Sequence, residues 1–286
     1  MKRGTCEFCG LKNVEIDLEH VCPTWMGNTA LAGLNSPQLR ISRGDNKTIH
    51  QTSRPGGISA INITARCACK LKCNNGWMGI LETKLSEFMK PMIADGATTT
   101  LNDERQILLA TWAIKTAMVH EFVDMDRNVY FRGDERRHVK SWSCPPDDVW
   151  IWLGHNLSSA FLHTWPVYLN RGESLDRRPS LYAFTFAAGH FLMQVFAYRR
   201  SEWQGLQGPS LNVGPFGDAF IPLWPRRTSA VALWPPPVGI TDDTLSTFQN
   251  RFHGGKVVRE GVYRRDHEGG YRLESPRDPK DRNGTT

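Results

Sequence analysis

The chain has 286 residues, 40% of them hydrophobic, and a formal net charge of +6. This length is ordinary for two domains, and the apolar content excludes a disordered chain as the default. No apolar run approaches the roughly 18 residues that cross a bilayer, and none follows the basic start of the chain, so we expect neither a membrane span nor a signal peptide. We therefore expect a cytoplasmic protein, in which clustered cysteines are more often metal ligands or catalytic thiols than disulfides.

The first third of the chain carries two groups of cysteines with a strand and a loop between them. "CEFC" supplies Cys6 and Cys9, and "VEIDLEHV" at 14–21 alternates apolar and acidic residues as a half-buried strand does. Residues 27–57 are rich in Gly, Ser, Asn and Pro, which predicts a long loop. The second group lies in "CACKLKCNNGW", residues 67–77.

The rest of the chain predicts helices followed by short strands. Apolar residues at helical spacing predict helices over 76–90, ended by Pro91 and Gly96, and from Asn102 to about residue 123. Aromatic and β-branched runs predict strands, with a hairpin centred on residues 188–190, and a short capped helix begins near residue 241. We expect an α+β fold with a zinc-stabilised module over 1–96, a mixed helical and antiparallel-strand domain over 97–263, and a disordered tail over 264–286.

The cysteine spacing predicts a structural zinc site. Zinc takes four ligands in a tetrahedron, and chains supply them as two closely spaced pairs. Cys6 and Cys9 form a C-x2-C pair, and Cys69 and Cys73 form a C-x3-C pair. We expect these four sulfurs to bind one zinc ion, with Cys67 as the alternative to Cys69. The competing interpretation is that the cysteines are buried apolar residues.

The order of these features resembles the HNH endonucleases, a group with a ββα-metal fold. "EHVCPTW" at 19–25 and "CNNGWMGILE" at 73–82 are similar to a bacterial and phage subgroup stiffened by a four-cysteine zinc. The resemblance covers residues 4–90. The sequence departs from many HNH proteins in its C-x3-C spacing, in having Glu19 where Asp or His is common, and in its longer loop.

The resemblance implies roles for three residues in phosphodiester hydrolysis. His20 falls on the position of the general base, and an imidazole can accept a proton from water near neutral pH. Glu19 and Asn74 fall on the positions that bind a catalytic divalent metal, with Asn75 as the alternative ligand. Mg²⁺ or Mn²⁺ would suit such oxygen ligands. Glu82 also matches the subgroup, although an exposed helical residue is an equally good interpretation.

The basic residues predict a nucleic-acid partner. Between His20 and Gly79 the only acid is Asp45, and seven cations are interspersed: Arg40, Arg43, Lys47, Arg54, Arg66, Lys70 and Lys72. Such a local positive field suits DNA, with RNA also possible in principle, whereas the plainer interpretation is a solvated loop.

Three functions remain open at this stage. The first is a metal-dependent DNA endonuclease. The second is a zinc-ribbon module that binds nucleic acid without cutting it, and the third is a structural zinc knot that serves a C-terminal domain with another activity. The set Glu19, His20 and Asn74 favours the first, because a pure ribbon has no need of an acid–histidine pair opposite its second cysteine pair.

Overall fold

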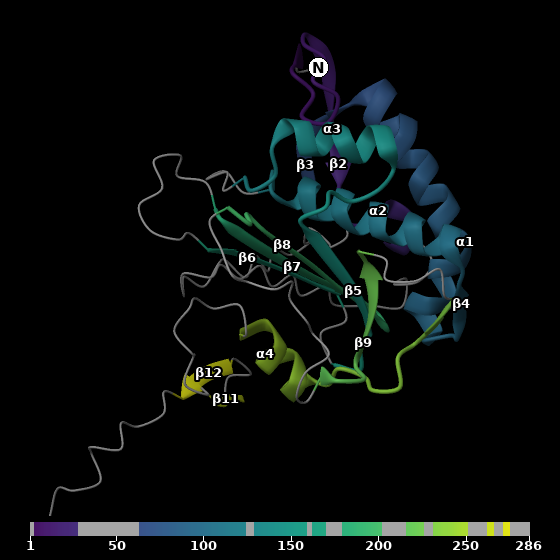
Figure 1. Ribbon diagram of the computed structural model, residues 1–286, viewed down its shortest axis with the longest axis vertical. Helices are drawn as coiled ribbons and strands as arrows, with labels where there is room; N and C mark the ends of the chain where they lie inside the picture. The colour runs from purple at the N-terminus through teal and green to yellow at the C-terminus, as the bar shows by residue number, and fades with distance from the viewer. Residues whose placement is uncertain are drawn as a thin grey trace, which may run out of the picture.

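The computed structural model describes residues 3–27, 63–123, 129–158, 162–169, 179–201, 216–225, 231–250, 262–265 and 271–274. In these ranges the protein is a mixed α+β structure whose sheets are antiparallel, as the sequence predicted. A small N-terminal sheet and three helices lie beside a larger sheet (Figure 1). No helix in the described ranges has the length and apolar character that a membrane crossing needs.

The N-terminal sheet has three strands in the order β1-β2-β3. β2 is the strand that the alternating pattern predicted, and the strands are β1 (Arg3–Gly4), β2 (Val14–His20) and β3 (Thr64–Cys69). Asp17 pairs with Ala68 and Leu18 with Arg66, so Cys67 is an extra residue between two paired positions. A bulge of this kind turns a side chain away from the face that strict alternation would give it.

The helix that follows is longer than the sequence predicted. A π-helical segment, η3 (Lys70–Met78), leads into α1 (Gly79–Asp95), and Pro91 lies inside α1 rather than ending it. Proline removes a backbone donor, but buried side chains on both sides of it, Phe88, Met89, Met92 and Ile93, keep the helix packed. Gly96 ends α1 with a φ of 64°, a left-handed conformation that favours glycine.

Two further helices follow. α2 (Asp103–His120) begins where it was predicted, because the Asn102 side chain accepts a hydrogen bond from the Arg105 N–H at 3.0 Å. It ends three residues earlier than expected. α3 (Gly133–Trp142) was not predicted; most of its residues are polar, and at its start the Arg132 N–H donates to the Glu135 carboxylate at 2.6 Å.

The larger sheet has five strands in the order β6-β7-β8-β5-β9. The predicted hairpin is present as β7 and β8, with its turn at Gly189 and His190. The strands are β5 (Val149–His155), β6 (Leu162–Leu169), β7 (Leu181–Ala188), β8 (Phe191–Tyr198) and β9 (Phe220–Trp224). The His190 N–H donates to the Ile93 carbonyl at 2.9 Å, and a Cβ on Gly189 would overlap that oxygen. The hairpin turn therefore docks on the last turn of α1.

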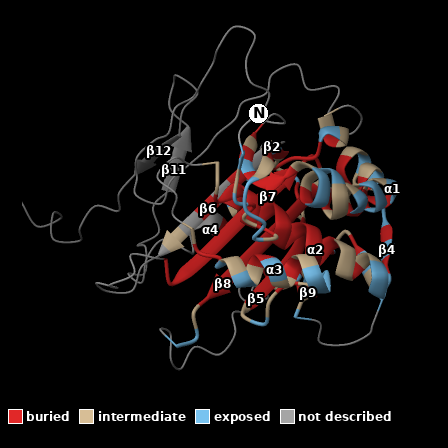
Figure 2. Ribbon diagram, turned by 90° about the horizontal axis from the view of Figure 1, so that it is seen from above, coloured by how far each residue is buried: buried red, intermediate tan, exposed pale blue. Residues whose placement is uncertain are grey.

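The five-stranded sheet has helices on both faces (Figures 1 and 2). On one face Trp112 of α2 packs edge-on to Phe186 and Phe191, and this cluster also contains the buried cysteines of the small sheet. On the other face Phe248 of α4 packs with Phe216 and Phe220. The apolar core on the α2 face contains residues from both sides of residue 96. The predicted domain boundary at residue 96 therefore stays a prediction.

The remaining elements are short. β4 (Thr99–Leu101) pairs with β10 (Ala232–Trp234), and α4 (Asp242–Asn250) is the short helix that the sequence predicted. β11 (Val262–Arg265) pairs with β12 (Tyr271–Glu274). This hairpin overlaps the start of the region predicted as a disordered tail, and the other residues of that region lie outside the described ranges.

Candidate metal centre and adjoining polar site

Four cysteine sulfurs converge at one end of the small sheet. The Sγ atoms of Cys6, Cys9, Cys69 and Cys73 all lie within 4.8 Å of one another. The Cys6–Cys73 and Cys9–Cys69 sulfur distances are both 3.7 Å. A tetrahedron with Zn–S bonds of about 2.3 Å has edges of about 3.8 Å, so the spacing fits a zinc ion and is too long for a disulfide. The four residues are positioned to bind a metal ion, compatible with structural zinc.

Local backbone geometry assembles the sulfurs. The Gly10 N–H donates to the Cys6 carbonyl at 2.9 Å, and Gly10 has a φ of 72°, so the chain turns tightly after the first pair. The Cys69 N–H donates to the Cys6 sulfur at 3.2 Å. The hydrogen bond between the Cys6 and Cys73 sulfurs lowers the pKa of Cys6 to about 4 and raises that of Cys73, so the two sulfurs share one proton that a bound metal would displace.

The other buried cysteines differ from these four. Cys67, the predicted alternative to Cys69, lies at the bulge of β3, with its sulfur 3.9 Å from the Ala65 carbonyl oxygen and outside the sulfur cluster. Burial raises the pKa of Cys67, and it raises the pKa of Cys22 to about 12. Both therefore stay neutral thiols. Of the two candidates for the third cysteine along the chain in the cluster, Cys69 and not Cys67 lies with the other sulfurs.

The cysteine cluster places Asn74 against β2. Asn74 directly follows the last cysteine, and its Nδ2 donates to the Leu18 carbonyl at 3.1 Å. Leu18 immediately precedes Glu19 and His20 on β2. The three residues of the predicted catalytic set therefore lie on two segments that touch beside the sulfur cluster. His20 is half-buried at the end of β2, opposite Thr64, whereas Asn75 is exposed.

Glu19 is buried and ion-paired. Its Oε1 lies 2.6 Å from the Nζ of Lys115 on α2, and the same Nζ lies 2.6 Å from Oε1 of Glu82 on α1. Burial opposes the charge on Lys115, but the two carboxylates more than offset it and raise the pKa of Lys115. Burial also raises the pKa of Glu19, partly opposed by Lys115. Only the second oxygen of Glu19 is left for a metal ion while this pair is intact.

Sequence reasoning missed Lys115. The signal for it was a single lysine inside the otherwise apolar segment "LLATWAIKTAMV", where a charge has to find a buried partner. It did not identify the partners, because Glu19 lies 96 residues and Glu82 lies 33 residues away along the chain.

Three of the predicted nucleic-acid contacts can be placed. Arg66 and Lys72 are exposed, and Lys70 is half-buried and paired with Glu15 at 3.1 Å. Arg40, Arg43, Lys47 and Arg54 lie outside the described residues.

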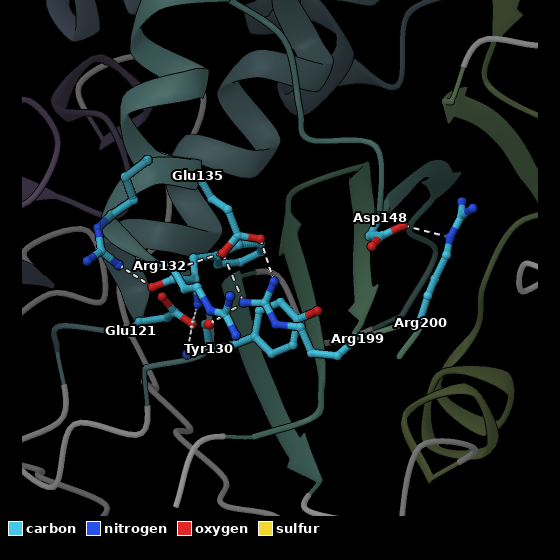
Figure 3. Close-up of polar contacts among 9 residues, drawn as sticks. Glu121, Tyr130, Arg132, Glu135, Asp148, Arg199 and Arg200 are labelled. Atoms are coloured by element: carbon cyan, nitrogen blue, oxygen red, sulfur yellow. Dashed lines mark hydrogen bonds and ion pairs between the residues drawn. The ribbon is translucent and has the colours of Figure 1, made fainter. Parts of the chain in front are cut away.

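A second polar cluster lies between α3 and the C-terminal end of β8, an interior strand of the large sheet (Figure 3). Arg199 forms two contacts with the Glu135 carboxylate, at 2.6 and 2.9 Å, and lies over the Tyr130 ring. Glu121 at the end of α2 accepts hydrogen bonds from the Tyr130 and Phe131 N–H groups at 2.7 and 3.3 Å. These contacts hold the chain between α2 and α3 against β8.

No family model, curated protein or solved structure matches this chain.

Proposed function

We propose that the protein is a metal-dependent endonuclease of the HNH type that hydrolyses phosphodiester bonds in DNA. In this proposal His20 is the general base, and Glu19 and Asn74 hold a catalytic divalent metal. Such a metal, Mg²⁺ or Mn²⁺, would neutralise charge on the phosphate and on the leaving 3′ oxygen. The residues themselves bind the metal and remove a proton from the attacking water.

The observation that carries the proposal is the hydrogen bond from Asn74 to the Leu18 carbonyl at 3.1 Å. It brings the residue after the last cysteine to the strand segment that ends in Glu19 and His20. A pure zinc ribbon requires the cysteines but gives no reason for an amide that binds the backbone next to an acid–histidine pair. The amide uses its nitrogen in that bond, which leaves the oxygen as the atom a metal would take.

A non-catalytic nucleic-acid-binding module is the second candidate, and one observation favours it. The Glu19 side chain is only 4% exposed and is ion-paired with Lys115, as a purely structural carboxylate would be. Glu19 therefore fits two roles, that of a metal ligand and that of a structural carboxylate. A cleavage assay distinguishes them.

The test is cleavage of supercoiled plasmid and of end-labelled single- and double-stranded DNA and RNA with Mg²⁺ or Mn²⁺. The parent protein is expected to cut at least one of these and to leave 5′ phosphate and 3′ hydroxyl ends. Removing a general base costs about 10²- to 10⁴-fold in rate, so His20→Ala is expected to lose visible cleavage while keeping its zinc content and DNA affinity.

His138→Ala is the matched control, because His138 is a half-buried histidine near the end of α3, with its Nε2 3.6 Å from the Cys144 sulfur. It is expected to cleave at the parental rate. Equal cleavage by His20→Ala and the parent would remove His20 from the mechanism. Binding without cleavage by the parent, under every metal condition, would leave the non-catalytic module as the function.

A further inference from the structure

Lys115 joins three elements at the candidate site. Its ammonium lies between the carboxylates of Glu19 on β2 and Glu82 on α1, at 2.6 Å from each. The Lys115 side chain is 0% exposed, and those of Glu19 and Glu82 are 4% and 18% exposed. Short hydrogen bonds between an ammonium and carboxylates are strong and hold these three side chains together.

The energetics make this arrangement costly to build and costly to break. Removing a carboxylate and an ammonium from water carries a desolvation penalty that only close, well-aligned pairing offsets. Well-packed apolar residues would stabilise such a position as well or better, so stability alone gives little reason for a buried lysine here. A function that needs the Glu19 carboxylate held in one position gives a better reason.

The geometry determines what the ammonium can control. Glu19 is adjacent to His20, and the preceding residue, Leu18, accepts the hydrogen bond from Asn74. Holding one oxygen of Glu19 on Lys115 therefore fixes the direction of the other oxygen and the end of β2 on which His20 lies. Glu82 binds the opposite side of the ammonium and keeps Lys115 in place.

We propose that Lys115 is a positioning residue for the nuclease site, that it orients Glu19 toward the catalytic metal, and that Glu82 anchors it. The inference rests on the proposed function and gives α2, which lies beyond the predicted zinc module, a part in the active site. Groups that hold and orient a metal ligand typically change metal affinity or activity by about 10- to 100-fold when they are removed.

The experiment compares full-length, zinc-loaded variants by cleavage rate across a series of Mn²⁺ concentrations. Lys115→Met keeps the length of the side chain and removes the charge. It is expected to cleave about 100-fold more slowly and to need about 10-fold more Mn²⁺ for half its maximum rate. Lys115→Arg, which restores a cation, is expected to recover part of the rate. Lys84→Met, an exposed lysine of α1, is the matched control and should behave as the parent.

The Mn²⁺ requirement separates positioning from support of the fold. A purely structural ion pair would lower the melting temperature and leave the Mn²⁺ dependence of the folded protein unchanged. If Lys115→Met loses its zinc or no longer unfolds cooperatively, Glu82→Gln replaces it in the experiment. The new amide oxygen can still accept a hydrogen bond from Lys115, so this variant disturbs the fold less. A loss of about 10-fold in rate with a raised Mn²⁺ requirement is expected for it.

Two negative results are distinguishable. A parent protein that cuts neither DNA nor RNA overturns the proposed function, and this inference falls with it. A parent that cuts, together with Lys115→Met or a folded Glu82→Gln that cuts equally well at the same Mn²⁺ concentrations, overturns the positioning role alone.

Discussion

The middle and the C-terminal end of α2 bury titratable side chains in opposite ways. Near its middle, the buried Lys115 pairs with the buried Glu19 and the half-buried Glu82. At its C-terminal end neither ring nitrogen of His120, and only one oxygen of Glu121, has a hydrogen-bond partner within the described part of the chain. Burial lowers the pKa of His120 to about 4 and raises the pKa of Glu121 to about 8.

The difference shows two ways in which the fold accommodates buried titratable side chains. His120 is neutral at pH 7 and Glu121 is largely protonated. The C-terminal end of the helix therefore buries these two side chains mainly in their neutral forms. At Lys115 the chain instead supplies a buried cation that pairs with two carboxylates and partly opposes the rise that burial causes in the pKa of Glu19. The contrast is between a pairing of opposite charges beside β2 and, among the described residues, the burial of polar atoms without hydrogen-bond partners at the end of α2.

The largest expected effect comes from removing the metal that the cysteine cluster is positioned to bind. Cys6→Ser, or prolonged chelation, is expected to release zinc and unfold the small sheet, because structural zinc in small modules contributes on the order of 10 kcal/mol of apparent binding. Zinc analysis and circular dichroism of the full chain measure this. The core on the α4 face of the large sheet contains none of the cysteines, so part of the β-sheet signal should remain.

Cys67→Ser is the matched control for the zinc prediction. Cys67 is buried beside the cluster but lies outside it, so this variant should keep one zinc per chain. Loss of zinc from Cys67→Ser, with retention by Cys6→Ser, would contradict the ligand assignment. A metal-free parent with a fully folded small sheet would contradict the zinc site itself.

The second prediction concerns the unpaired end of α2. The folded state raises the pKa of Glu121 to about 8, above its unfolded value, so its stabilising contribution is present below about pH 4.5 and is lost as pH rises through about 8. Glu121→Gln cannot ionise, so it should gain stability relative to the parent between pH 5 and pH 9. The gain is a few kcal/mol, since one pKa unit corresponds to about 1.4 kcal/mol.

Urea unfolding of both proteins at pH 5, 7 and 9 measures this gain. The slope against pH is the relevant quantity, because the new amide adds a constant offset at the unpaired Oε2 position. Glu104→Gln, an exposed glutamate in the first turn of α2, controls for loss of charge on the same helix. A Glu121→Gln protein with the parental pH dependence would show that Glu121 is ionised in the folded protein.

The smallest effect is expected from the basic residues of the segment 27–57, which the sequence predicts to be a loop and which lies almost entirely outside the described residues. Charge reversal of Arg43, Lys47 and Arg54 together should weaken DNA binding and reduce the salt dependence of the affinity by about three ions, because each lost phosphate contact releases about one counterion fewer. Binding titrations at several salt concentrations give this slope. An unchanged slope would mean that the loop is only solvated.

Much of the local structure was predictable from the sequence. The alternation in "VEIDLEHV" predicted β2, the helical spacing of apolar residues after Asn102 predicted α2, and the glycine-centred run at 181–198 predicted the β7–β8 hairpin. These features depend on neighbouring residues and on hydrogen bonds that close within a few positions. The two cysteine pairs could also be recognised in the sequence, because the spacing of metal ligands along the chain is itself a local property.

The tertiary structure decided the rest, because each remaining choice depends on contacts between distant segments. Pro91 could stay inside α1 because both of its flanks are buried. Cys69 rather than Cys67 reached the metal cluster because a bulge in β3, set by its pairing with β2, turned Cys67 aside. Lys115 met Glu19 and Glu82 only once α2 packed against the small sheet and α1. Burial and charge pairing are properties of the assembled core, so no pattern along the chain could specify them.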